Sequence, residues 1–309
     1  MVGLEPDNTE YLRDLSISFD NMGNMDGHRD PDQARQWYLK ELVISEKLVG
    51  LEPDNTKYLR DLSISFDNIG DLDLKSDLGQ ARKWFFESLL IDEWLVEFDH
   101  KSIEYLQKLS MSYKRMDEID TKLDPPRSVL WTRKLLTVRQ QIVVNEPDNT
   151  EFLRNLSITL NRMGNKEGRN NLRKRLQWYL ECLKIREKIV TLEPEYADNF
   201  GYLASSYFLI AKVYCHLNML SEECQYTIKA SESYEKAIEL NPDNADVQYG
   251  LACTCARLGE ADKALAALSR SINLGNGDAD YTAQDVDLIS LRGLPEFEAL
   301  LERMRQATV

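Results

Sequence analysis

The feature that most constrains this chain is a repeat of 47 residues. The hexapeptide Leu-Glu-Pro-Asp-Asn-Thr at residues 4–9 recurs at 51–56 and, with Asn in first place, at 145–150, and a degenerate copy occupies 98–103. The same spacing separates four tryptophans, Trp37, Trp84, Trp131 and Trp178. A fixed period of roughly 20 to 50 residues is typical of stacked supersecondary units. The chain is therefore predicted to be a repeat array.

Each unit predicts two helices. The first follows the Pro-Asp-Asn-Thr turn, whose Asn or Thr side chain can cap free backbone N–H groups. Apolar residues then recur at helical spacing, and we expect Gly23, with its counterparts Gly70 and Gly164, to end the first helix. Asp30 and Pro31 mark the start of the second helix. Neither helix can bury its apolar stripe alone, so neighbouring units must stack.

These patterns predict an all-α array over residues 1–275, followed by C-terminal capping helices at 276–309. In the least regular unit we expect a long first helix from Ala197 to His216 and a second helix capped by Ser221. The predicted units lie near residues 4–50, 51–97, 98–144, 145–191, 192–240 and 241–275.

Small, aromatic and glycine positions in these units resemble the tetratricopeptide repeat family. In the first unit they are Leu15, Ser16, Phe19, Gly23, Ala34 and Tyr38. The sixth unit, with Leu251, Ala252 and Gly259, has the family's ordinary length of about 34 residues. The resemblance, to a long-repeat bacterial variant, implies a right-handed superhelical solenoid of about six helix-turn-helix units. Because residues 1–6 match the end of a unit at 48–53, we expect the chain to be the C-terminal array of a larger protein.

Composition excludes several classes of function. With 43% hydrophobic and 29% charged residues the chain can bury a core, and its net charge of −14 argues against nucleic acid, which needs a basic face. No apolar run is long enough to span a bilayer, so we expect no membrane association and a cytoplasmic location. The five cysteines are nowhere spaced as Cys-x-x-Cys and are predicted to be small core residues.

No pattern indicates a catalytic, metal or cofactor site. The three histidines, His28, His100 and His216, fall at unrelated repeat positions, and the chain lacks a phosphate-binding glycine loop and a nucleophile elbow. Carboxylates are abundant, but most are expected to be solvated helix or turn residues. We therefore predict that the protein is not an enzyme and holds no metal or cofactor.

A partner is expected to bind in the concave groove formed by the first helices of the units. Outward positions there repeat as columns, one apolar and others bearing guanidinium, ammonium or amide groups able to grip peptide carbonyls and acidic side chains. The arginines could instead pair along the helix, Arg13 with Glu10 and Arg154 with Glu151. Extra packing between units could account for the isoleucines. The predicted binding residues are Arg13, Ile17, Arg60, Ile64, Asn68, Lys108, Met111, Lys114, Arg115, Arg154, Ile158, Asn161 and Arg162.

The leading hypothesis is a scaffold or regulatory module that binds a protein or peptide with an acidic stretch. The resemblance implies that such an array could control an effector domain absent from this chain. The family's carboxylate clamp for chaperone tails has Lys and Asn where Arg13 and Ile17 stand, which argues against that role. The alternative is self-association through exposed array ends at Tyr11, Leu12 or Leu15. We expect the tryptophans to be core residues.

Overall fold

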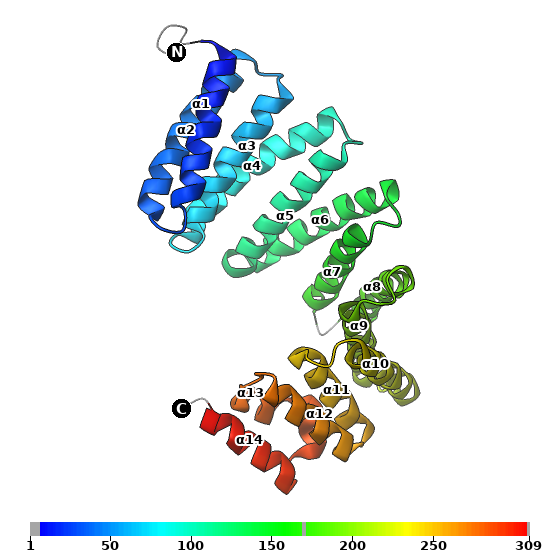
Figure 1. Ribbon diagram of the computed structural model, residues 1–309. Coiled ribbons are helices and arrows are strands. Elements are labelled where there is room, and N and C mark those ends of the chain that lie inside the picture. The colour runs from blue at the N-terminus through cyan, green and yellow to red at the C-terminus, as the bar shows by residue number, and fades with distance from the viewer. Residues whose placement is uncertain (1–6, 169–170, 308–309) are drawn as a thin grey trace. The chain divides into compact units, whose positions relative to one another are not determined.

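The computed structural model describes residues 7–168 and 171–307, which form fourteen α-helices and one 3₁₀-helix and include no strand. The predictions for residues 4–6, 169–170 and 308–309 lie outside the described residues. Helices pack in consecutive pairs, α1 with α2, α3 with α4 and so on, as Figure 1 shows. The predicted all-α repeat fold is confirmed. We call the first member of each pair an A helix and the second a B helix.

The chain divides into two compact units, Met1–Glu146 and Pro147–Val309. The first unit contains α1 (Thr9–Asp26), α2 (Pro31–Leu51), α3 (Thr56–Asp73), α4 (Leu78–Phe98), α5 (Ile103–Leu123) and α6 (Pro125–Asn145). The second unit contains α7 (Thr150–Lys166), α8 (Leu172–Leu192), α9 (Ala197–His216), α10 (Leu220–Leu240), α11 (Ala245–Leu258), α12 (Ala261–Asn273), α13 (Ala279–Gln284), η1 (Val286–Leu291) and α14 (Pro295–Ala307).

The predicted helix starts are confirmed in the early repeats. The Asn8 side chain accepts hydrogen bonds from the backbone N–H groups of Glu10 and Tyr11, and Asp30 accepts one from Gln33 at 3.0 Å. These bonds satisfy donors that have no partner within the first turn. Turn chemistry in the sequence therefore fixes where these helices begin.

The predicted cap at Ser221 is wrong. Helix α10 begins at Leu220, after Met219, and no side chain caps it. Asn218 adopts a left-handed conformation, with φ of 57°, and the Met219 N–H bonds the Tyr214 carbonyl. The helix therefore begins two residues earlier than a serine cap at Ser221 would place it.

The prediction that Gly23, Gly70 and Gly164 end their helices is also wrong. Helix α1 continues to Asp26, and the other two glycines likewise lie inside α3 and α7. A Cβ atom at Gly23 would lie 2.3 Å from the Tyr38 ring, and one at Gly164 equally close to Tyr179. Glycine stands there because the aromatic ring of the B helix packs directly on the backbone of the A helix.

In each of the first four helix pairs, a tryptophan of the B helix bonds to an acid at the end of the A helix or just after it. The Trp37 indole N–H donates to Asp26 at 3.1 Å, and its ring stacks on Phe19 at 5.7 Å between centroids. The same bond, to a carboxylate eleven residues earlier, recurs at Trp84, Trp131 and Trp178. Trp131 is buried and the other three are half-buried, which agrees with their predicted role as core residues.

The ends of the array differ from expectation in one respect. Leu12 is buried against Leu48 and Tyr58, so its predicted exposure is wrong, and Tyr11 and Leu15 are half-buried. At the other end, η1 and α14 bury apolar side chains in one core with α11 and α12. These side chains are Leu288, Leu291, Phe297, Leu301 and Met304.

Burial also corrects the expectation for the cysteines. Cys182, Cys253 and Cys255 are buried as predicted, whereas Cys215 is half-buried and Cys224 is exposed. Burial raises the pKa of the Cys182 thiol, which favours its neutral form. The buried thiols are therefore packing residues.

Candidate functional site: the A-helix face

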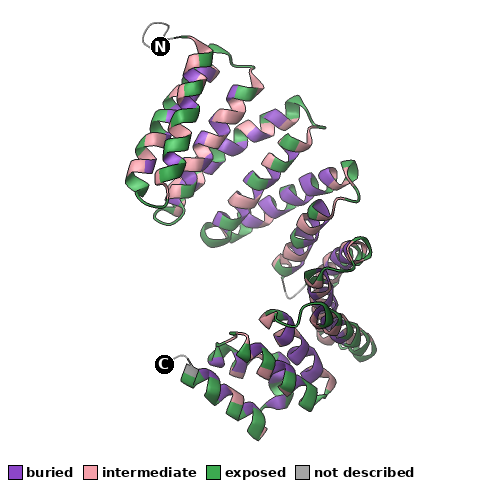
Figure 2. Ribbon diagram, in the orientation of Figure 1, coloured by how far each residue is buried: buried purple, intermediate pink, exposed green. Residues whose placement is uncertain are grey.

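The A helices present one side to their B helices and another to solvent. Buried residues lie where the two kinds of helix meet, and exposed residues cover the outer sides (Figure 2). We call the solvent side of α1, α3 and α5 the A-helix face of the first unit, and the solvent side of α7 and α9 the A-helix face of the second unit. Every predicted binding residue lies on one of the A helices α1, α3, α5 and α7.

The predicted apolar column reaches solvent at three of its four positions. Ile17, Met111 and Ile158 are 40%, 47% and 45% exposed. Ile64 is half-buried and lines a pocket with Leu95. Packing between repeats therefore leaves a large part of Ile17, Met111 and Ile158 in contact with solvent.

Each arginine of the predicted column pairs with an acid of the following repeat. Arg13 Nε lies 2.8 Å from an oxygen of Asp61, on the following A helix. Arg60 pairs in the same way with Glu104, and Arg154 with Glu193. The alternative of pairing with Glu10 and Glu151 along the helix is wrong for Arg13 and Arg154, because an acid of the next repeat lies closer to each guanidinium.

The predicted basic stretch on α5 is already paired with carboxylates of α3. Both Lys108 and Arg115 bind Asp67, and a second nitrogen of Arg115 lies 2.9 Å from Asp71. Lys114 has only a 3.9 Å contact, with Glu118 on its own helix. Much of the positive charge that the sequence offers to a partner is therefore neutralised within the protein.

The remaining predicted residues are less exposed than expected. Asn68 donates a 2.7 Å hydrogen bond to Asp20 of the preceding A helix. Asn161 and Arg162 are half-buried on α7, and the Asn161 Oδ1 atom is buried without a hydrogen-bond partner. Amides on this face thus join repeats as well as lining the surface.

A buried polar seam between repeats was missed by the sequence reasoning. Ser63 on α3 and Ser112 on α5 donate hydrogen bonds of 2.8 and 2.5 Å to the two carboxylate oxygens of Asp92 on α4. The sequence did contain a signal for the seam, namely a column of hydroxyl residues that recurs every 47 residues. Its members are Ser65, Ser112, Thr159 and Ser206, all at most 2% exposed.

The seam includes an acid with a strongly shifted pKa. Burial raises the pKa of Glu41 to about 7, although a 2.8 Å hydrogen bond from Ser65 favours the ionised form. Burial raises the pKa of Asp92 as well.

Two pockets open on the A-helix face at equivalent positions. Six of the seven lining positions coincide after a shift of 94 residues, twice the repeat length. The first, which we call the Asp92 pocket, has a volume of about 250 Å³, and the second, the Arg186 pocket, about 70 Å³. The Asp92 pocket is lined by Arg60, Ile64, Asp92, Leu95, Glu104, Tyr105 and Lys108. The Arg186 pocket is lined by Arg154, Ser157, Ile158, Arg186, Ile189, Asn199 and Tyr202.

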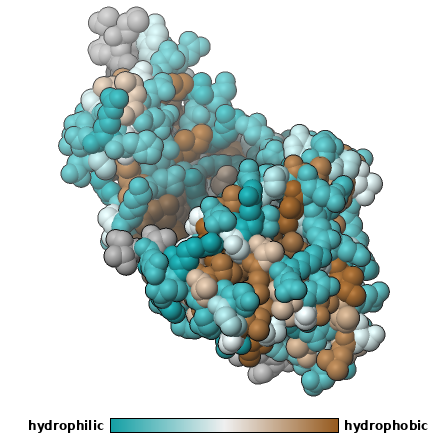
Figure 3. Space-filling view, turned by 60° about the horizontal axis from the view of Figure 1, so that its bottom comes forward, coloured by the Kyte–Doolittle hydropathy of each residue, from teal (hydrophilic) through white to brown (hydrophobic). Residues whose placement is uncertain are grey.

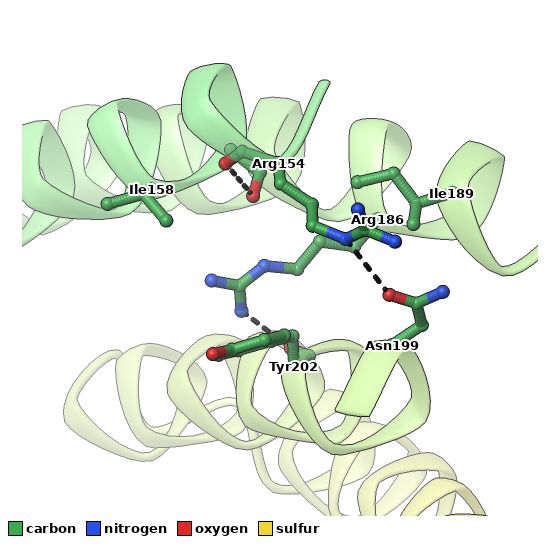
Figure 4. A pocket seen from close by; sticks show the side chains of 7 residues that line it. Arg154, Ile158, Arg186, Ile189, Asn199 and Tyr202 are labelled. Carbon is green, nitrogen blue, oxygen red and sulfur yellow. Dashed lines mark hydrogen bonds between the residues drawn. The ribbon is translucent and has the colours of Figure 1, made fainter. Parts of the chain in front are cut away.

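In the Arg186 pocket two guanidinium groups face one helix. Figure 4 shows Arg154 from α7 reaching toward Asn199 and Arg186 from α8 lying over Tyr202, both on α9. Arg186 is 4% exposed and donates hydrogen bonds of 2.5 Å to the Tyr202 carbonyl and 2.8 Å to the Ser206 hydroxyl. Its Nε atom is buried without a hydrogen-bond partner.

A second apolar surface, on the B helices of the first unit, was not predicted. Leu39 and Val43 lie one turn apart on α2 and are 40% and 65% exposed, and Phe86 and Leu90 repeat them on α4 at 38% and 47%. In the space-filling view of Figure 3, apolar residues lie scattered among hydrophilic ones on the visible face. The sequence reasoning assigned the B helices to packing and so overlooked these four residues.

The described residues give no sign of metal or membrane chemistry. In residues 7–168 and 171–307, no three His, Cys, Asp or Glu side chains are grouped so as to hold a metal ion. Within the same residues, no helix combines the length and the apolar character needed to cross a bilayer.

Comparison with known proteins identifies the repeat. Family models described as tetratricopeptide repeat match residues 211–244 and 228–283. No curated protein matches the sequence.

Solved structures resemble this chain at low sequence identity. BtubC from P. vanneervenii is 14% identical, with a TM-score of 0.53 over 78% of this chain and 89% of its own. MamA MSR-1 is 16% identical, with a TM-score of 0.45 over 71% of this chain and 95% of its own. MamA from Desulfovibrio magneticus RS-1 is 14% identical, with a TM-score of 0.42 over 69% and 94%. Repeats of this family support a protein-interaction scaffold in general, and the family models identify tetratricopeptide repeats within residues 211–283, whose paired helices resemble those of the rest of the described chain.

Proposed function

We propose that this protein is a scaffold that binds a partner polypeptide on its A-helix face. The observation that carries the proposal is the exposure of Ile17, Met111 and Ile158, which recur at one repeat position. Apolar side chains repeated on a wet surface lower stability and solubility unless a partner covers them. Burial of such side chains contributes about 25 cal/mol per Å² of apolar area, which makes the column the main source of affinity.

The charged residues of this face have a different part in the proposal. Arg13, Arg60 and Arg154 hold consecutive repeats together, so they set the spacing of the apolar column. Solvated pairs contribute at most about 1 kcal/mol each, so their contribution to a partner is orientation and association rate. An acidic partner segment would be attracted by Lys114, which is 42% exposed and lies 3.9 Å from Glu118. Control of an effector domain by the bound array stays a prediction from the family resemblance.

The test compares partner capture by three forms of the protein. One carries Met111→Glu with Ile158→Glu, the second carries Val144→Glu at a 79% exposed position on the B helix α6, and the third is the wild type. We expect quantitative mass spectrometry to find a polypeptide retained by the wild type and the α6 variant and lost by the double variant. Equal retention by all three folded proteins would exclude the A-helix face as the binding site.

A second candidate function, self-association, is favoured by the exposed residues of α2 and α4. Leu39, Val43, Phe86 and Leu90 provide a repeated apolar surface outside the A-helix face. If it joins two copies, the mass measured by light scattering rises with concentration, and Val43→Glu with Leu90→Glu holds the protein monomeric. A wild type that is monomeric at every concentration excludes this candidate.

A further inference from the structure

The Arg186 pocket contains a buried positive charge without a negative partner. Among residues 7–168 and 171–307, no carboxylate pairs with the Arg186 guanidinium, whose contacts are the Tyr202 carbonyl, the Ser206 hydroxyl and the Tyr202 ring, 5.5 Å away. Arginine remains protonated in proteins, so it cannot escape burial by losing its charge. A buried, uncompensated ion is costly, and compensation by a bound anion would relieve that cost.

The neighbouring arginine does not supply the missing charge. Arg154 pairs with Glu193, so this ion pair is neutral and leaves the positive charge of Arg186 in excess. The Arg154 Nε atom lies 3.4 Å from the Asn199 amide oxygen, which fixes the guanidinium beside the pocket (Figure 4). An anion entering here meets one unbalanced guanidinium and a second that is held in place.

The size and walls of the pocket restrict the anion. A volume of about 70 Å³ exceeds the roughly 15 Å³ needed for one water but admits only a few heavy atoms. Ile158 and Ile189 form aliphatic walls beside the guanidinium groups. A carboxylate on a short hydrocarbon stem matches both features, since its oxygens accept N–H bonds and its methylene groups contact the isoleucines.

We infer that the Arg186 pocket is the subsite that receives an acidic side chain, Asp or Glu, of the partner polypeptide. The inference rests on the proposed function, because it assigns one contact to a partner bound on the A-helix face. Ile158 belongs both to the exposed apolar column and to this pocket, so a chain lying on the column passes its entrance. The repeat-equivalent Asp92 pocket has a carboxylate at the same position, and its two cations, Arg60 and Lys108, are matched by two acids, Asp92 and Glu104, so it offers no excess positive charge to such a side chain.

The first experiment tests the pocket without a partner. The full chain, labelled with ¹⁵N, is titrated through the millimolar range with N-acetylglutamate methylamide, and the arginine Nε–H signals are followed by NMR. We expect a saturable shift of the Arg186 signal, and no shift with N-acetylglutamine methylamide. No saturable shift, or an equal one with the glutamine analogue, overturns the inference. An equal shift with inorganic phosphate overturns its selectivity for carboxylate.

The second experiment uses the partner captured as described above. Arg186→Met should weaken its binding at least about ten-fold, since a hydrogen bond to a charged group contributes about 1.5–3 kcal/mol. Lys184→Met, an exposed charge loss on the same helix, is the matched control and should leave binding unchanged. If binding depends on Met111 and Ile158 but not on Arg186, this inference fails while the proposed function stands. Unfolding curves of both variants establish that each remains folded.

Discussion

The Asp92 and Arg186 pockets occupy the same repeat position and have opposite chemistry. In the first, the buried carboxylate of Asp92 accepts hydrogen bonds from Ser63 and Ser112. In the second, a buried guanidinium donates to Ser206 and a backbone carbonyl. Equivalent repeat positions therefore line both cavities, and the buried B-helix side chain at that position is a carboxylate in one and a guanidinium in the other.

The column that carries this side chain is Ser45, Asp92, Arg139 and Arg186, buried at every position. Hydroxyl groups on both sides can donate to an acid or accept from a base, which lets the same seam hold either charge. The two repeats thus place side chains of opposite charge at one buried position of the B helix. The variants described next test this difference between the Asp92 and Arg186 pockets.

The largest effect is expected when the aspartate of the Asp92 pocket is replaced by the arginine found in the Arg186 pocket. Asp92→Arg removes the acceptor of two buried serine hydroxyls and places a guanidinium in a site built for a carboxylate. We expect a loss of about 3–5 kcal/mol in the free energy of unfolding, measured in urea. Glu87→Arg, exposed on the same helix, should change it by less than about 0.5 kcal/mol. A loss under about 1 kcal/mol for Asp92→Arg would show that the two pockets are interchangeable.

The next largest effect is expected from the buried acid Glu41 of the polar seam when the pH changes. The pKa of Glu41 is raised to about 7 from 4.5, so folding favours its protonated form. Its contribution to stability is full below pH 4.5 and is lost as pH rises through 7, by up to about 3 kcal/mol. The Glu41→Gln variant keeps the shape of the side chain and stays neutral. Subtracting its free energy of unfolding from that of the wild type at each pH should isolate this dependence. Identical pH profiles for the two proteins would contradict it.

A smaller effect is expected from removing the unbalanced charge. Arg186→Met keeps much of the side-chain volume and relieves the desolvation of an ion without a counter-charge. We expect the free energy of unfolding to stay within about 1 kcal/mol of the wild type, or to rise. A loss above about 2 kcal/mol in urea would mean that Arg186 is a structural residue, which would blur its contrast with Asp92.

The smallest effect concerns the ion pairs at the rims of the two pockets. Arg60 and Glu104 are 44% and 62% exposed, whereas Arg154 and Glu193 are 36% and 22% exposed. Double-mutant cycles to alanine should give couplings of about 0.2–1 kcal/mol, with the larger value for the Arg154 pair because solvent screens it less. Added salt should weaken both couplings. A stronger Arg60 pair would reverse this ranking.

Much of the local structure could be predicted from residues whose effect is local. Asn8 and Asp30 cap helices through bonds to groups two or three residues away, so the sequence alone located those starts. Gly23 was misread because the reason for a glycine there lies in Tyr38, fifteen residues later, and appears only when the two helices pack. The apolar column was found for the same reason as the helices, since its spacing is a property of one repeat.

What the sequence determined by itself is the period, and with it the helix pairs, the tryptophan column and the positions that recur on each face. What only the tertiary structure decided is which charges are neutralised by a neighbouring repeat. Arg13, Arg60 and Arg115 each pair with an acid of a neighbouring repeat, while Arg186 does not pair with any described acid. The physical reason is distance, because an ion pair depends on separations of a few ångströms and residues about 40 to 50 positions apart acquire such separations only when repeats stack.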